Sequence, residues 1–159
     1  MFDELGKLSW LWMNSPLHRD WPVELFSKFI LPPIAANQYL LLERVGFPVA
    51  YCSWAFLNEK TEAKYMIDPS NISPSDWRQG DNLWFIDWIA PFSKSDSFQL
   101  RTQLKAKFAN SIARAIRVKA HKTNARVMEF KGPNVDGLVA RSQFSEHYQK
   151  FLSGLNIQR

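Results

Sequence analysis

The sequence has a single cysteine, Cys52, and this scarcity excludes two kinds of architecture. One thiol cannot form an internal disulfide framework, and it cannot supply a metal site built from several cysteines. Cys52 lies in the apolar run of residues 49–56, which favours a buried, packed thiol over a catalytic nucleophile. We therefore expect neither a disulfide scaffold nor a bound metal.

Glycine is also scarce, with six residues, and none of them lies in a motif that cradles phosphate. The P-loop pattern and the dinucleotide-binding pattern do not occur, and the His-Glu-x-x-His motif of zinc proteases is missing as well. These absences leave nucleotide-binding and zinc-protease functions without support.

Long apolar runs and a secretory leader are absent too. No stretch approaches the roughly 20 apolar residues that are needed to span a bilayer. The first four residues include Asp3 and Glu4, whereas a signal peptide begins with a basic region. We expect a cytoplasmic protein with no membrane span.

What is present is typical of one globular domain over residues 1–159. Hydrophobic residues make up 46% of the chain and charged residues 22%, which are ordinary values for a soluble protein. Aromatic residues reach 14%, and all seven tryptophans lie within the first 88 positions.

The charge is distributed unevenly along the chain. Residues 1–100 carry 8 basic and 12 acidic side chains, a net charge of −4, whereas residues 101–159 carry 12 and 3, a net charge of +9. A basic C-terminal third indicates an acidic partner such as nucleic acid, a membrane surface or an acidic protein. The alternative is a solvated basic face that has no partner.

Apolar periodicity and turn residues predict an alternation of helices and strands. Helices are expected at residues 3–14, 23–29, 59–67, 96–108 and 136–152, with the second one ending before Pro32 and Pro33. Strands are expected at residues 37–44, 48–57, 83–90, 112–119 and 125–131, the first two forming a hairpin. Residues 68–82 read as turns. This order favours an α+β domain with a mainly antiparallel central sheet flanked by helices.

Two residues stand out as candidates for chemistry. His18 lies in a short loop that Pro16 and Pro22 constrain, and Asp87 is a lone carboxylate within an apolar strand. A buried carboxylate is costly unless it is paired, and histidine is the side chain best suited to move protons near neutral pH. If the fold joins them, the chain has a base and a group that orients it. A purely structural Asp87 would instead pair with an arginine such as Arg114 or Arg117.

The remaining candidates carry weaker signals. Ser15 precedes His18 by three positions and permits a Ser-His-Asp hydrolase, but no Gly-x-Ser-x-Gly elbow surrounds it. His121, in a basic loop, and His147, in a helical pattern, are expected to be surface residues.

Several blocks of the sequence closely resemble the RTX toxin-activating lysine acyltransferases. The blocks that carry the resemblance are residues 6–12, 15–19, 38–39, 48–55, 84–92 and 114–118. Two of them, Ser-Pro-Leu-His-Arg and Trp-Phe-Ile-Asp-Trp-Ile-Ala-Pro-Phe, are long and unusual, and the similarity extends over nearly the whole chain.

The resemblance implies a GNAT-like acyltransferase fold, often dimeric, that works in the bacterial cytoplasm. It implies transfer of a fatty acyl chain from acyl carrier protein to internal lysines of an RTX protoxin, with the phosphopantetheine thioester as donor and no bound cofactor. The family's catalytic histidine and aspartate fall on His18 and Asp87, and its supporting serine falls on Ser15. We expect His18 to act as a base or through an acyl-histidine intermediate.

An acidic carrier protein also fits the charge asymmetry, and Arg114 and Arg117 are the first residues we expect it to contact. Two alternatives remain open. One is a Ser15-His18-Asp87 thioesterase that releases the acyl group to water. The other is a basic module that binds nucleic acid, although the basic third lacks the interleaved aromatic residues of a base-stacking surface. We therefore expect no nucleic-acid partner.

Overall fold

A computed structural model of the chain describes residues 1–118 and 126–157, with side chains as far as residue 154. The helices are α1 (Phe2–Asn14), α2 (Phe26–Phe29), α3 (Leu31–Ala36), α4 (Glu59–Ile67), α5 (Lys94–Lys107) and α6 (Gly137–Ile157). The strands are β1 (Tyr39–Arg44), β2 (Phe47–Leu57), β3 (Asn82–Ile89), β4 (Ile112–Arg117) and β5 (Arg126–Lys131). Short 3₁₀ turns cover Val23–Leu25, Pro69–Asn71 and Pro74–Trp77.

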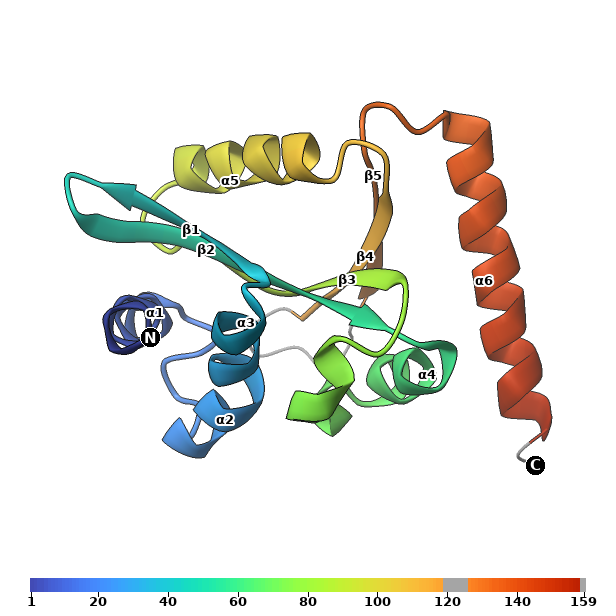
Figure 1. Ribbon diagram of the computed structural model, residues 1–159, viewed down its shortest axis with the longest axis horizontal. Helices are drawn as coiled ribbons and strands as arrows, with labels where there is room; N and C mark the ends of the chain where they lie inside the picture. Colours follow the sequence, from blue (N-terminus) through green and yellow to red (C-terminus); the bar gives the residue numbers. More distant parts are fainter. Residues whose placement is uncertain (119–125, 158–159) are drawn as a thin grey trace.

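The five strands form one sheet in the order β1-β2-β3-β4-β5, as Figure 1 shows. Neighbouring strands are antiparallel except β3 and β4, which are parallel. The expected α+β fold with a mainly antiparallel sheet is confirmed. The hairpin between β1 and β2 turns at Val45 and Gly46, both with positive φ, as a tight two-residue hairpin requires.

Helices cover both faces of the sheet (Figure 1). Helices α1 to α4 lie on one face, where Leu8, Trp12, Tyr65 and Trp84 belong to one buried cluster. Helix α5 lies on the opposite face, where Leu100 joins a second cluster with other buried residues of the sheet. The middle strand β3 is largely buried, as its lack of alternation predicts.

The two parallel strands separate soon after they meet. Backbone pairing between β3 and β4 is confined to Trp84 with Arg114 and Phe85 with Ala115, although β3 continues to Ile89 and β4 to Arg117. Beyond these pairs the strands diverge, so the sheet opens at the positions where β3 carries Asp87.

A β-bulge changes the direction of the Asp87 side chain. Trp54 pairs with Phe85 and Cys52 pairs with Trp88, so Ser53 on β2 faces two residues, Ile86 and Asp87, on β3. An extra residue shifts the alternation of side chains along a strand. As a result Asp87 points to the face that carries α1, whereas simple alternation from Phe85 would direct it toward α5.

Some local predictions are wrong in detail. A helix was not expected at the proline pair, but α3 begins at Leu31 and holds Pro32 and Pro33 in its first turn. Proline fits there because the first helical N–H groups have no partner within the helix. The polar segment 68–82 contains two 3₁₀ turns, and α6 extends to Ile157. Over residues 1–118 and 126–157, no helix combines the length and the apolar character that a membrane crossing requires.

Candidate active site

His18 lies in a tight turn that follows α1. The helix ends at Asn14, and its C-cap Ser15 has the extended backbone expected before Pro16. The Ser15 carbonyl accepts hydrogen bonds from the N–H groups of His18 and Arg19, both at 3.0 Å, and the His18 carbonyl accepts one from Trp21 at 2.9 Å. This hydrogen bonding fixes the backbone that carries the imidazole.

Aromatic rings enclose the imidazole on two sides. The ring centroid of His18 lies 5.0 Å from that of Trp12 and 4.7 Å from that of Trp21. The side chain is only 3% exposed. Packing of this kind restricts the ring to one orientation, which a proton-transfer group needs.

The structure brings together the three residues that the sequence singled out. His18 Nε2 lies 3.3 Å from Asp87 Oδ1, and His18 Nδ1 lies 2.7 Å from Ser15 Oγ. A carboxylate can only accept, so a hydrogen bond to Asp87 requires a proton on Nε2. Ser15 can donate to Nδ1 or accept from it, and it therefore accommodates either tautomer of the ring.

The Asp87 carboxylate is buried and only half satisfied. The Asp87 backbone N–H donates to Ser53 Oγ at 3.2 Å, while Oδ2 has no hydrogen-bond partner among the described residues. No arginine forms an ion pair with it in the part of the chain that the structure describes. Because an unpaired buried carboxylate oxygen is costly, a hydrogen-bond donor that reached Oδ2 would be stabilised there.

Asp87 also influences the pKa values of neighbouring buried side chains. Burial, and then the charge of Asp87, raise the pKa of the Cys52 thiol well above its ordinary value. The same two causes raise the pKa values of Tyr65 and Tyr51. Cys52 is fully buried, which confirms that it is a packing residue, and its thiol stays protonated.

A cavity of about 730 Å³ adjoins His18 and Asp87. It runs through the opening between β3 and β4, because its lining includes Trp21 and Phe29 on the α1 side and Ser97 of α5 on the other. Its lining is mostly apolar and aromatic, as in sites for hydrophobic ligands. Ser15 does not line this cavity, so its hydroxyl lies behind the imidazole.

The two arginines that the sequence grouped together are separated by the structure. Arg117 lines the cavity at an exposed position, and Arg101 of α5, which is also exposed, lines it elsewhere. Arg114 is buried on a different side, with Nη1 3.2 Å from Glu62 Oε1. This geometry gives the predicted carrier contact of Arg114 no support, whereas it leaves Arg117 in a suitable position.

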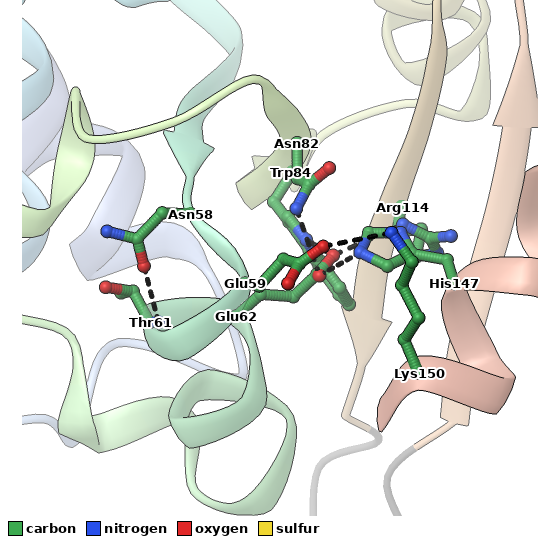
Figure 2. A network of polar contacts seen from close by, with 9 residues as sticks. All are labelled: Asn58, Glu59, Thr61, Glu62, Asn82, Trp84, Arg114, His147 and Lys150. Atoms are coloured by element: carbon green, nitrogen blue, oxygen red, sulfur yellow. Dashed lines mark hydrogen bonds and ion pairs between the residues drawn. The ribbon is translucent and has the colours of Figure 1, made fainter. Parts of the chain in front are cut away.

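Glu62 is the centre of a buried polar network that sequence reasoning missed (Figure 2). Its carboxylate accepts hydrogen bonds from Trp84 Nε1 at 2.7 Å and from Asn82 Nδ2 at 3.2 Å, and it pairs with Arg114 and His147. It thus joins α4, β3, β4 and α6 where the parallel strands meet. In the sequence Glu62 looks like any polar residue of a weakly amphipathic helix.

Of the other two histidines, His147 does not line the cavity beside His18, and His121 is not among the described residues. His147 was expected on the surface, which is wrong, because its side chain is 16% exposed and paired with Glu62. His121, which the sequence places in a basic loop, lies outside the described residues. Among the described residues, no cluster of three or more His, Cys, Asp or Glu side chains could hold a metal ion.

Comparison with known proteins gives the same family throughout. The profile of the RTX toxin acyltransferase family (HlyC) matches residues 1–131. The chain is 46% identical to the protein-lysine myristoyltransferase RtxC of Kingella kingae over 157 residues, 99% of this chain and 93% of that protein.

Two further relatives agree. The protein-lysine palmitoyltransferase CyaC of Bordetella bronchiseptica is 45% identical, over 97% of this chain and 83% of its own. The protein-lysine myristoyltransferase HlyC of Escherichia coli is 46% identical, over 94% and 86%. The chain belongs to the RTX toxin acyltransferase family and is a protein-lysine fatty acyltransferase.

Proposed function

We propose that this enzyme transfers a fatty acyl chain from the phosphopantetheine thioester of acyl carrier protein to an internal lysine of an RTX protoxin and so activates the toxin. The observation that carries the proposal is the contact between His18 and Asp87 at the wall of an apolar cavity of about 730 Å³. Relatives that share about 45% of the sequence are protein-lysine myristoyl- and palmitoyltransferases.

His18 serves as the general base for the acceptor lysine. A free lysine has a pKa of about 10.4, so at neutral pH nearly all of its side chain is the non-nucleophilic ammonium. The lysine ammonium first loses one proton to solvent. In the tautomer whose Nδ1 proton is donated to Ser15 Oγ, the unprotonated Nε2 of His18 takes a second proton as the neutral amine attacks the thioester carbonyl, and Nε2 then donates its hydrogen bond to Asp87. The resulting imidazolium returns that proton to the departing thiol, and an amide is left on the lysine.

Asp87 has two parts in this scheme. Its Oδ1 lies against Nε2, where it stabilises the imidazolium that forms during the transfer. Its free Oδ2 accepts a hydrogen bond from the incoming ammonium and holds the lysine beside the base. Ser15 supports the orientation of the ring from the opposite side, and because it lies outside the cavity it is not the nucleophile.

The donor side fits an acidic carrier protein. Arg101 and Arg117 both line the cavity and are both exposed. The basic C-terminal third, with a net charge of +9, attracts an acidic surface toward this side. A phosphopantetheine arm carries no adenosine or pyrophosphate, which agrees with the missing glycine-rich phosphate motifs.

The architecture supports the GNAT-like fold that the resemblance implies. The supporting feature is a parallel strand pair, β3 and β4, that separates within an otherwise antiparallel sheet. We place the reaction in the bacterial cytoplasm, where acyl carrier protein is found, and we retain the homodimer as a prediction.

The test is a purified reaction that contains enzyme, acyl carrier protein loaded with a myristoyl or palmitoyl chain, and a protoxin fragment. We expect intact-mass analysis to find the fragment heavier by one acyl group per modified lysine. Transfer from coenzyme A thioesters but not from acyl carrier protein would refute the proposal that the carrier is the donor. Release of free fatty acid without lysine modification would favour the thioesterase alternative.

A further inference from the structure

The relatives differ in the length of chain that they transfer. RtxC and HlyC are myristoyltransferases, whereas CyaC is a palmitoyltransferase at a similar level of identity to this chain. A common scaffold that handles chains of two lengths must contain an element that limits the chain. An apolar pocket discriminates chain length by where it ends.

A second cavity lies directly beyond the catalytic one. Its volume is about 330 Å³, and it lies between α5 and strands β3 to β5. Both cavities are lined by Phe85, Trp88 and Phe130 and by the exposed Arg101, so three rings and one arginine side chain stand between them. We refer to the three rings as the aromatic partition.

The rings of the aromatic partition pack against one another without a break. The centroid of Phe130 lies 5.5 Å from that of Phe85 and 6.0 Å from that of Trp88, and the Phe85 and Trp88 centroids are 5.8 Å apart. The indole N–H of Trp88 donates to Ser97 Oγ at 3.1 Å and so fixes the orientation of that ring. Offset and edge-to-face contacts of this kind hold rings in defined positions.

The partition differs from the opposite side of the catalytic cavity. There Phe29 and Tyr65 are 6% and 3% exposed and belong to the main core cluster beneath the sheet. Phe130 is only partly buried and lies on the edge strand β5 beside the second cavity. A change of volume is therefore accommodated at Phe130 more readily than at Phe29.

We propose that Phe85, Trp88 and Phe130 form the end wall that sets the length of the acyl chain this enzyme transfers. The proposal rests on the function proposed above. The carrier approaches the exposed end of the cavity at Arg117, the thioester lies beside His18, and the methyl end of the chain reaches the partition. A chain too long for this space would have to displace the rings and enter the second cavity.

The test is a competition among acyl carrier proteins loaded with 12-, 14-, 16- and 18-carbon chains, with the products on a protoxin fragment separated by intact mass. The product ratio gives the ratio of kcat/KM for each pair of chains. We expect Phe130→Ala to shift the ratio of 18- to 14-carbon products by about ten-fold or more toward the longer chain, since one methylene in an apolar pocket changes kcat/KM by about that much. Phe130→Trp should shift it toward 12 carbons.

Matched variants distinguish a change in chain-length preference from a general loss of structure or activity. Ser111 lines only the second cavity, so Ser111→Phe should cancel the gain of Phe130→Ala by filling the space that the longer chain enters. Phe29→Ala removes a ring of the same size from the other side and should leave the length ratio unchanged. Should Phe130→Ala fail to fold, Phe130→Leu should move the ratio in the same direction by a smaller factor.

Two results would overturn the proposal: an unchanged ratio in folded Phe130 variants, or a shift toward longer chains caused by Phe29→Ala. A wild-type enzyme that transfers no acyl chain from acyl carrier protein would instead refute the proposal that this carrier is the donor. The same series of chains presented as coenzyme A thioesters would then decide whether the partition limits the chain.

Discussion

Asp87 lies 3.3 Å from the imidazole of His18 although the alternation of side chains along β3 would direct it to the other face of the sheet. The bulge opposite Ser53 turns it toward α1, and the hydrogen bond from the Asp87 N–H to Ser53 Oγ closes that bulge. His18 and Asp87 therefore meet because one strand contains one additional residue.

The carboxylate of Asp87 should be needed for catalysis and not for folding. Asp87→Asn keeps the shape of the side chain but cannot stabilise an imidazolium by charge, so we expect kcat to fall by about 10²-fold or more. Asp96 is a suitable control because it is also buried and is paired with Arg44 outside the cavity. Asp96→Asn should lower the melting temperature and leave kcat within a few-fold of wild type. Equal kcat losses in both variants would contradict the role of Asp87.

Ser15 should contribute to the orientation of His18 and not to covalent chemistry. Removal of its hydroxyl by Ser15→Ala eliminates the 2.7 Å contact with Nδ1, and we expect kcat to decrease by about ten-fold. A serine-directed reagent such as a fluorophosphonate should leave the wild-type enzyme unlabelled. Labelling of Ser15 together with complete loss of activity in Ser15→Ala would establish the thioesterase mechanism instead.

Arg117 should act on the binding of the acyl donor. Arg117→Glu places a like charge opposite an acidic carrier, so KM for the acyl carrier protein should rise by about ten-fold at low salt while kcat stays nearly constant. The difference from wild type should shrink as salt is added, because screening weakens exposed charges. Arg141 on α6 is exposed and outside the cavity, so Arg141→Glu is the matched control. An unchanged KM in Arg117→Glu would show that Arg117 does not contact the acyl carrier protein.

Glu62 should matter mainly for stability. Glu62→Ala leaves the buried guanidinium of Arg114 without its carboxylate, which typically costs about 3–5 kcal/mol of unfolding free energy. Glu59 offers a comparison on the same helix, since its pair with Lys150 is about 70% exposed on both sides. Glu59→Ala should cost less than about 1 kcal/mol in urea unfolding. Similar losses of unfolding free energy in both variants would show that the network in Figure 2 contributes little to stability.

Most of the fold follows from local patterns in the sequence. The hairpin at Val45 and Gly46, the continuous apolar run of β3 and the helical spacing of α1 are short-range features, and each one was predicted close to its observed limits. Pro32 and Pro33 predict the end of a helix, because the residue before a proline avoids the helical conformation. Proline is also favoured in the first turn of a new helix, and this second preference explains α3.

The candidate site is only partly readable from the sequence. His18 and Asp87 could be chosen because a histidine between prolines and a carboxylate in an apolar strand are both unusual locally. The bulge at Ser53 leaves no such trace, since it arises from the pairing of β2 with β3. For the same reason Arg114 and Arg117 look equivalent in the sequence, and only the packing of α4 and α6 separates them.

The central claim is that His18 takes the proton from the acceptor lysine. The most direct test is the single-turnover rate of lysine acylation by His18→Ala, measured by intact mass with pre-loaded acyl carrier protein and a protoxin fragment. We predict a rate about 10²- to 10⁴-fold below wild type in a protein with an unchanged circular dichroism spectrum. A folded His18→Ala enzyme that acylates the lysine at the wild-type rate would contradict the account.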